Sequence, residues 1–496
     1  MLLICKQLFS AWTQLEVRYC HWKSNEHLEE GLDGKTDLDV FVALDDKVPC
    51  EEGLKSCSLI KFRPQASSRY PGVDEWLGFD PSTGAMIHVH LHFRLITGTK
   101  FCKEYEFPIG DLMLSTRIVD ADTDVYVASP DLEIIILFAR IALKAGKTGR
   151  VKLKSYRDEI VYLKERMDAA KVQSYCIQFL GEKDGASFFG QISDELETVD
   201  WKQVLALAKR WLNPYRTRFP LSCWFRSKYY WFRLYWDMFV NRLGGRVINK
   251  KTLPHKGLSV AFIGQDGSGK STVSKDIFSW LNWKVAVHSF YLGTGDGYQS
   301  LLKSLLARAS GKSRKPAEKQ EPVHEAVSPH DANNDMTLRH LVGAVLTSWH
   351  LCCATSAALK KARQACRYVR KGGIALFDRF PQDQFPGIYD GPKINSLYGE
   401  SKRLGFLFRR LARREERNIR KMQQYAPELV FKLVLPPEES IRRKPFENVE
   451  MVKRKALITQ ELSFPKSTIY TIDATEEYAS EIVRIKSKIW DSLKTL

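Results

Sequence analysis

The sequence has no C-x-x-C pair, no long apolar run at its start, and no internal repeat or coiled-coil heptad. Its ten cysteines are scattered, and Cys352 and Cys353 are the one close pair. This spacing argues against a disulfide framework or a cysteine zinc site and favours a reducing cytosol. Lys6 and Gln7 interrupt the apolar start too early for a signal peptide. We therefore expect a cytoplasmic protein that is at most peripheral to a membrane.

The longest apolar stretch runs from Leu341 to Leu359 and contains His350 and several small or hydroxyl residues. It can be interpreted as a weak transmembrane span or as a long buried helix beside a sheet. The buried helix is the favoured interpretation.

Acidic residues are in deficit, with 58 Asp and Glu against 76 Lys and Arg, for a net charge of +18. This charge is compatible with a nucleic acid, an anionic membrane or a phosphate-rich substrate. The basic run from Lys402 to Lys421 has helical periodicity. It is either a solvated face or a surface that attracts an anionic lipid, glycolipid or polyphosphate. Nucleic acid is not expected as a partner, because no recognition motif accompanies the charge.

Composition changes along the chain predict three domains: 1–128, 129–250 and 251–496, with a mobile insertion at 311–335. In the first, we expect a helix with Leu8, Trp12 and Leu15 on one face, a strand from Leu38 to Leu44, and a hairpin. The hairpin strands end near Phe79 and run from Met86 to Leu95. The second domain is a helical connector that begins with Ser129 as N-cap and Pro130 at the first helical position.

The end of the helical region, from Cys223 to Leu243, interleaves aromatic residues with arginine and lysine. Such a helix can pack as a bridge between domains or lie on a membrane surface.

The octapeptide from Gly264 to Ser271 fits G-x-x-x-x-G-K-[ST], the P-loop. An apolar run predicts a strand before it, and Thr272 to Leu281 predicts a helix after it. In this setting backbone N–H groups surround a phosphate, Lys270 reaches the β- and γ-phosphates, and Ser271 ligates Mg²⁺. The predicted nucleotide-binding residues are Gly264, Asp266, Gly267, Ser268, Gly269, Lys270, Ser271 and Thr272.

A second predicted strand, Gly373 to Phe377, ends in Asp378-Arg379. An acidic residue at this place in a P-loop protein holds Mg²⁺, directly or through water, and the arginine suits a bidentate grip on phosphate. A third strand, Leu429 to Leu435, precedes Arg442-Arg443-Lys444, cations that can close over a transferring phosphoryl group. Lys270, Asp378, Arg379, Arg442 and Arg443 are therefore the predicted catalytic residues.

This order of motifs resembles the thymidylate kinase family over about 240 residues, from Leu258 to the C-terminus. The resemblance implies that Asp266 contacts a substrate hydroxyl, and that Asp378 and Arg379 assist Mg²⁺ and clamp the acceptor phosphate. The chain departs from the family at 380–385, where a thymine-recognition element is missing, and at 291–296, where an arginine-containing loop is missing. It looks more like the divergent thymidylate-kinase-like proteins of bacterial polysaccharide loci.

Near the N-terminus, the segment from Gly34 to Val40 fits G-x-[ST]-D-h-[DE]-h and resembles the polymerase-β-like nucleotidyltransferases. Asp37 and Asp39 alternate along a strand, so both face one side and can share a divalent ion. The strand on which we expect a third carboxylate carries His88, His90 and His92 instead. These histidines are either metal ligands or hydrogen-bonded structural groups, and nucleotidyl transfer is left open.

We therefore expect an α/β chain: a C-terminal P-loop domain with a doubly wound parallel sheet, and an N-terminal α+β nucleotidyltransferase-like domain with a helical connector. The expected function is ATP- and Mg²⁺-dependent transfer of a phosphoryl group to a nucleoside monophosphate or a related hydroxyl or phosphate acceptor. Two alternatives are a kinase on a sugar or lipid-linked glycan and an ATP-dependent regulatory or defence protein. The sequence gives no oligomeric state.

Overall fold

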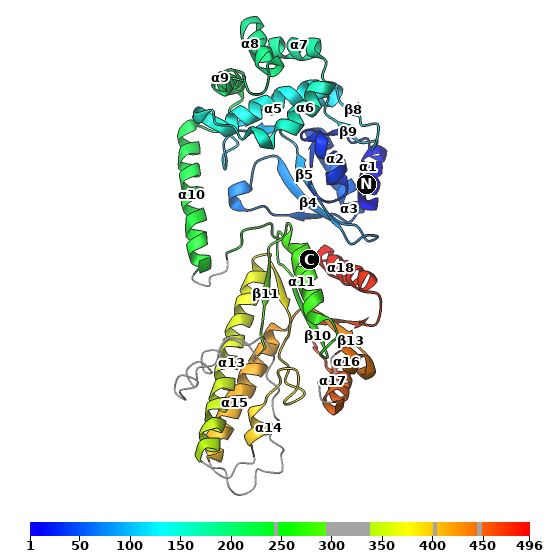
Figure 1. Ribbon diagram of the computed structural model, residues 1–496, viewed down its shortest axis with the longest axis vertical. Coiled ribbons are helices and arrows are strands. Elements are labelled where there is room, and N and C mark those ends of the chain that lie inside the picture. Colours follow the sequence, from blue (N-terminus) through cyan, green and yellow to red (C-terminus); the bar gives the residue numbers. More distant parts are fainter. Residues whose placement is uncertain (243–246, 294–337, 400–403, 444–448) are drawn as a thin grey trace. The chain divides into compact units, whose positions relative to one another are not determined.

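The computed structural model describes residues 1–242, 247–293, 338–399, 404–443 and 449–496 (Figure 1). The chain divides into two compact units, Met1–Pro254 with Leu493–Thr495, and His255–Ser492 with Leu496. The insertion predicted at 311–335 and Lys444 of the predicted basic lid lie outside the described residues.

The first unit begins with a mixed α/β region and continues as helices, joined in places by short 3-10 turns. The strands are β1 (Tyr19–His21), β2 (Asp37–Val42), β3 (Ile60–Phe62), β4 (Val73–Phe79), β5 (Met86–His92), β6 (Ile96–Thr97), β7 (Tyr105–Glu106), β8 (Ile118–Val119) and β9 (Tyr126–Val127). The helices are α1 (Leu3–Gln14), α2 (Leu28–Leu32), α3 (Lys47–Ser56), α4 (Gly110–Ser115), α5 (Pro130–Ala145), α6 (Arg157–Arg166), α7 (Ala169–Leu180), α8 (Glu182–Ser193), α9 (Trp201–Leu212) and α10 (Pro220–Arg242).

The sheet of this unit has seven strands in the order β3-β4-β5-β2-β1-β9-β8. The predicted hairpin is confirmed: β4 and β5 pair antiparallel with Phe79 opposite Met86. The Asp80 carboxylate accepts N–H groups of Ser82 and Thr83 and so fixes the turn. β5 also pairs in parallel with β2, which sets Asp37 opposite His88 and Asp39 opposite His90.

Apolar residues of β2 and β5 cover one face of the sheet and pack with α1 and α3. Leu8 and Trp12 are fully buried there, as their spacing predicts. Leu15, expected on the same face, is 39% exposed because the helix ends at Gln14. The other face carries the acidic and histidine side chains considered below.

Helices α5 to α9 share one hydrophobic core with residues of the N-terminal sheet, including Trp22 and Phe41. The predicted cap of α5 is confirmed, since Ser129 Oγ accepts the N–H of Leu132 and Pro130 opens the helix. The helical region 129–250 therefore belongs to the first compact unit, because its apolar faces have no separate core of their own.

A cluster of carboxylates lies between α5 and the segment after β1. Glu133, 1% exposed, accepts the backbone N–H of Asn25 at 3.1 Å and its Nδ2 at 2.6 Å. Glu26 and Glu159 lie close by. Burial, with Glu159 as a further cause, raises the pKa of Glu133 from 4.5 to about 8.

This raised pKa predicts that the free energy of unfolding falls as the pH rises from about 5 to about 8. Over that range the unfolded chain loses the Glu133 proton while the folded chain keeps it, so ionisation favours unfolding. The loss is on the order of 2–4 kcal/mol for a shift of this size. Urea unfolding of the full chain checks it: Glu133→Gln should show a shallower pH dependence than the wild type. The exposed Glu165→Gln control should keep the wild-type dependence.

Helix α10 is the aromatic segment singled out in the sequence. Arg226 Nε donates to the carbonyl of Phe101, and the Tyr230 hydroxyl donates to the carbonyl of Ala66. Cys223 is the one fully buried side chain that α10 contributes. Its large apolar side chains that are at least 40% exposed are Leu221, Trp224, Phe225, Tyr229, Trp231, Phe232, Leu234, Tyr235, Trp236, Met238 and Phe239.

The second unit is a P-loop α/β domain with a five-stranded, all-parallel sheet in the order β11-β12-β10-β13-β14. The strands are β10 (Ser259–Gly264), β11 (Val287–Phe290), β12 (Ile374–Phe377), β13 (Leu429–Val434) and β14 (Thr468–Asp473). The helices are α11 (Lys270–Asn282), α13 (Leu338–Arg370), α14 (Ile394–Tyr398), α15 (Gly405–Met422), α16 (Pro437–Arg443), α17 (Val449–Glu461) and α18 (Tyr478–Lys494).

Helices α13 and α15 run side by side in this unit (Figure 1). Asn418 donates to Ser356 Oγ at 3.0 Å, and Cys352 Sγ donates to the carbonyl of Leu411. Leu341–Arg370 of α13 is long and apolar enough to cross a membrane by length and composition alone, and a third of its most apolar window is buried. A core helix passes the same test, so this finding is weak support for a span.

Candidate functional site

The P-loop lies where the sequence places it, between β10 and α11. Gly267 and Gly269 both have φ of +83°, a region that favours glycine. A Cβ on Gly264 would lie 2.5 Å from the carbonyl oxygen of Leu433, so only glycine fits between the loop and β13. Lys270 is the first residue of α11, and its Nζ donates to the carbonyl of Gln265 at 2.7 Å. The ammonium is therefore folded back over the loop.

Asp266 forms an ion pair with Lys455 of α17, a residue 189 positions away that the sequence analysis missed. Burial alone would raise the pKa of Asp266, but the hydrogen bond and charge of Lys455, with Lys270 and Arg379, hold it below its usual range. The Asp266 carboxylate is therefore ionised, and its charge is stabilised by Lys455, Lys270 and Arg379.

The two predicted lid arginines differ in where they lie. Arg443 donates to the carbonyls of Gly267, at 3.3 Å, and Ala474, at 3.2 Å, so it reaches the P-loop. Arg442 pairs with Glu439 at 2.7 Å, and its side chain is 78% exposed. Ser440 of the same helix donates to the carbonyl of Asp266 at 2.7 Å. α16 is thus bonded to the P-loop through Ser440 and Arg443, whereas Arg442 pairs with Glu439 of its own helix.

Asp378 directly follows β12, which is the immediate neighbour of β10. Parallel strands end at one edge of a sheet, so Asp378 and the P-loop share that edge. Its Oδ1 is buried and has no hydrogen-bond partner among the residues that the structure describes. Ser271 is exposed in the first turn of α11. A buried carboxylate oxygen without a hydrogen-bond partner and the hydroxyl of an exposed serine fit the oxygen ligands that Mg²⁺ takes.

Arg379 directly follows the partly buried Asp378 and is itself exposed. Desolvation alone would lower the pKa of its guanidinium, but Asp390, Tyr291 and Asp266 raise it above its usual range. Tyr389 and Asp390 both have positive φ, +47° and +55°, which marks a strained turn facing this arginine.

The segment 380–385 is held by hydrogen bonds between the Gln382 side chain and nearby backbone groups. Gln382 is fully buried, its Nε2 donates to the carbonyls of Phe385 and Ile388, and its Oε1 accepts the N–H groups of Gln384 and Phe385. Every polar group of this side chain is used to hold the loop. It is therefore a structural residue and not one that contacts a base.

A second polar cluster lies on the first unit's sheet. His88 lies between Asp37, with Nδ1 2.7 Å from Oδ1, and Glu75, with Nε2 2.5 Å from Oε2. Glu75 comes from β4, so the expectation that this face lacks a third carboxylate is wrong. The hairpin register could have shown it, since Phe79 opposite Met86 sets Glu75 opposite His90.

Lys23 contacts Asp39, and other basic side chains lie near Lys23. Lys23 Nζ lies 2.8 Å from Asp39 Oδ1. Burial, followed by the charges of Lys23, Arg140 and Lys144, lowers the pKa of Lys103 to about 7. Lys103 itself has φ of +50°. Basic side chains gathered near one another produce a positive field that suits a polyanion.

Comparison with known proteins finds relatives that are named as ATP-binding proteins. No protein-family profile matches the chain. It is 28% identical over 265 residues to the uncharacterized ATP-binding protein YghR of Escherichia coli strain K12, covering 50% of this chain and 94% of that protein. It is 27% identical over 227 residues to the uncharacterized ATP-binding protein YghS of the same strain, covering 45% and 89%.

Among solved structures, a deoxyadenosine kinase from M. mycoides with bound dATP matches 47% of this chain and 98% of its own. The identity is 15% and the TM-score 0.25. A TM-score of that size carries no argument about fold or substrate, so the assignment of a P-loop α/β domain rests on the loop and sheet described above.

Proposed function

We propose that this chain is an ATP- and Mg²⁺-dependent kinase of the thymidylate-kinase type. It transfers a phosphoryl group to a nucleoside monophosphate or a related hydroxyl or phosphate acceptor. The observation that carries the proposal is the gathering of Lys270, Lys455 and Arg443 around the P-loop at the sheet edge that also holds Asp378. The names of the ATP-binding relatives support ATP as the donor.

In this proposal the P-loop N–H groups at the start of α11 bind the phosphates of ATP, and Lys270 turns from Gln265 toward the β- and γ-phosphates. Arg379 holds the acceptor phosphate in a bidentate grip. Ser271 and Asp378 are the residues that would hold Mg²⁺, which neutralises phosphate charge when bound. Asp266, kept ionised by Lys455, accepts a hydrogen bond from an acceptor hydroxyl.

The structure of 380–385 predicts that thymidylate is a poor acceptor. Gln382 is fully engaged in its own loop, so it offers no group to pair with the base, and a pocket without such a group discriminates weakly. ADP release should be measured with ATP, Mg²⁺ and each nucleoside monophosphate in turn, against the rate without acceptor. Thymidylate is expected to stimulate turnover no more than the other monophosphates.

The same assay tests the proposal as a whole. Stimulation by at least one phosphate- or hydroxyl-bearing acceptor, with phosphorylated product found by mass spectrometry, supports a kinase. ATP hydrolysis that no nucleotide, sugar or glycan acceptor stimulates would contradict phosphoryl transfer and favour the ATP-dependent switch. Stimulation by thymidylate alone would contradict the prediction about 380–385 but not the kinase.

One observation favours a second candidate, a kinase on a sugar or lipid-linked glycan. Helix α10 exposes several tryptophan and tyrosine side chains together with Lys228 and Arg233. Exposed aromatic and cationic side chains on one helix are typical of helices that lie at an anionic membrane surface. The basic face of α15 gives a similar attraction for an anionic lipid or glycolipid, and a lipid-linked acceptor would be presented there.

For the first unit we propose a nucleotidyltransferase-type domain that binds a polyphosphate. Asp37 and Asp39 lie on one sheet face, Lys23 contacts Asp39, and Lys103, Arg140 and Lys144 lie near Lys23. These groups support the binding of a phosphate chain, while its transfer to an acceptor stays a prediction.

A further inference from the structure

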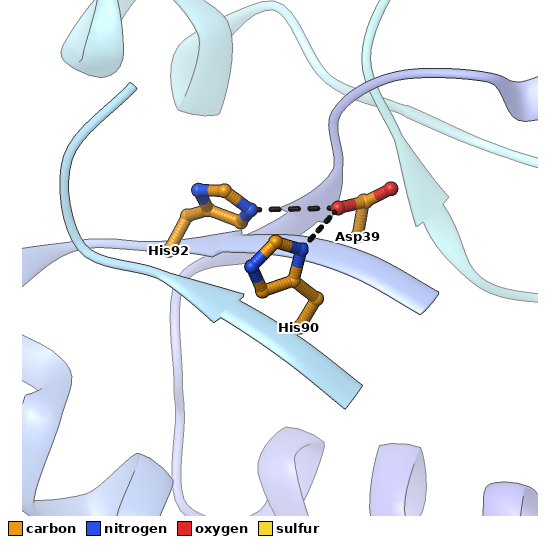
Figure 2. A group of neighbouring side chains, drawn as sticks. All are labelled: Asp39, His90 and His92. Carbon is orange, nitrogen blue, oxygen red and sulfur yellow. Dashed lines mark hydrogen bonds and ion pairs between the residues drawn. The ribbon is translucent and has the colours of Figure 1, made fainter. Parts of the chain in front are cut away.

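Asp39, His90 and His92 converge on one point of the first unit's sheet (Figure 2). Asp39 Oδ1 lies 3.0 Å from His90 Nδ1 and 3.4 Å from His92 Nε2. One ligand atom of each residue lies within 4.8 Å of the others. The convergence follows from the register, because Asp39 lies opposite His90 and His92 follows two residues later on the same face of β5.

His92 is the member of the group that most needs a partner. Its side chain is 5% exposed, and neither of its ring nitrogens makes a hydrogen bond of good geometry to any residue in the described parts of the chain. A buried polar group without a hydrogen bond destabilises the folded state. A metal ion bound at Nε2 would satisfy one of these nitrogens directly.

The carboxylate of Glu75 lies near the ring nitrogen of His90 that points away from Asp39. Its Nδ1 faces Asp39, and its Nε2 lies 3.5 Å from Oε1 of Glu75, a residue that is 6% exposed. Histidines that bind metals usually direct their second nitrogen at a carboxylate or carbonyl, which fixes the ring and its tautomer. Glu75 is thus placed as the outer partner of His90.

Lys23 supplies the positive charge next to Asp39 in the structure as described. Its ammonium is carried on a four-carbon stem with several rotatable bonds, and Asp39 has a second oxygen. A metal ion can therefore displace Lys23 or share the carboxylate with it.

We propose that Asp39, His90 and His92 form a binding site for a single transition-metal ion of the zinc, cobalt or manganese class. Two imidazoles with one carboxylate favour such ions over Mg²⁺, which prefers oxygen ligands. Asp37 is not part of this site, because its carboxylate pairs with His88. Three protein ligands leave a coordination position open for water or for a phosphate oxygen, next to Lys23 and the basic side chains near it.

The test is metal binding to the full-length, tag-free protein after treatment with a chelator. Isothermal titration with Zn²⁺, Co²⁺ and Mg²⁺ in the absence of nucleotide should give one tight site for Zn²⁺ and Co²⁺ and much weaker binding of Mg²⁺. His92→Ala and the milder His90→Asn should each weaken Zn²⁺ binding roughly 100-fold, and Glu75→Gln roughly 10-fold, as loss of an outer partner does. The visible spectrum of bound Co²⁺ should show nitrogen and oxygen ligands without thiolate.

A matched control is available on the same protein. His27→Gln removes an exposed histidine that lies outside the proposed group. It should bind Zn²⁺ like the wild type, and circular dichroism should show that every variant is folded. Equal binding of Zn²⁺ and Mg²⁺, unchanged binding in the His90 and His92 variants, or an equal loss in His27→Gln would overturn the assignment. None of these readouts depends on kinase activity.

Discussion

Replacement of Lys270 by alanine is expected to lower ATP turnover roughly 100- to 1000-fold, the effect of removing one charged donor from a developing phosphoryl charge. Lys270 is the first residue of α11, and its ammonium already lies over the P-loop through Gln265. The other described cations near the loop extend from other helices and hold other partners, since Lys455 pairs with Asp266 and Arg443 is bonded to two carbonyls. ADP release by purified wild type and variant measures the difference.

A matched control lies on the same helix. Lys275 is exposed one turn further along α11, so Lys275→Ala removes the same charge from a solvated position. It should keep wild-type turnover and the same thermal unfolding midpoint. Turnover in Lys270→Ala within a few-fold of wild type would mean that the P-loop is not the site of ATP hydrolysis.

The P-loop strand and helix were predictable because their signal is local and contiguous. The expected strand from Leu258 to Ile263 is observed as β10, Ser259–Gly264, and the expected helix from Thr272 begins two residues earlier, at Lys270. The strand that precedes Asp378 was predictable for the same reason. Buried parallel strands are short apolar runs, and polar residues that follow such runs meet at one sheet edge.

Lys455 and Glu75 were not predicted because their partners are distant in the sequence. Lys455 lies on an ordinary amphipathic helix, and nothing near it in the chain indicates that it will meet Asp266. Glu75 is different. The hairpin was predicted, and its strand pairing sets Glu75 opposite His90, but the third carboxylate was sought on the histidine strand alone. A pairing register therefore carries information about a site that a motif search does not.

The other large effect is expected at Asp378. Its buried Oδ1 has no hydrogen-bond partner in the described segments, which leaves this oxygen available to a metal ion or its water. Asp378→Asn removes the carboxylate charge with little change in volume. We expect turnover to fall roughly 100-fold or more, and the Mg²⁺ concentration for half-maximal rate to rise, because the ion loses a charged ligand or the anchor of its water.

Arg379 offers the contrast that makes this result specific. It follows Asp378 directly but is assigned to the acceptor, so Arg379→Ala should lower the rate with the acceptor and leave ATP binding and the Mg²⁺ dependence near wild type. Asp383 is exposed and lies five residues after Asp378, so Asp383→Asn should change neither the rate with the acceptor nor the Mg²⁺ dependence. ATP affinity, Mg²⁺ dependence and rate should be measured for all three variants. If ATP affinity collapses in Arg379→Ala while Asp378→Asn keeps a normal Mg²⁺ dependence, the two roles must be exchanged. Because the side chains are neighbours on one short segment, a general disturbance of that segment would affect both variants alike, and a difference between them must come from what each side chain contacts.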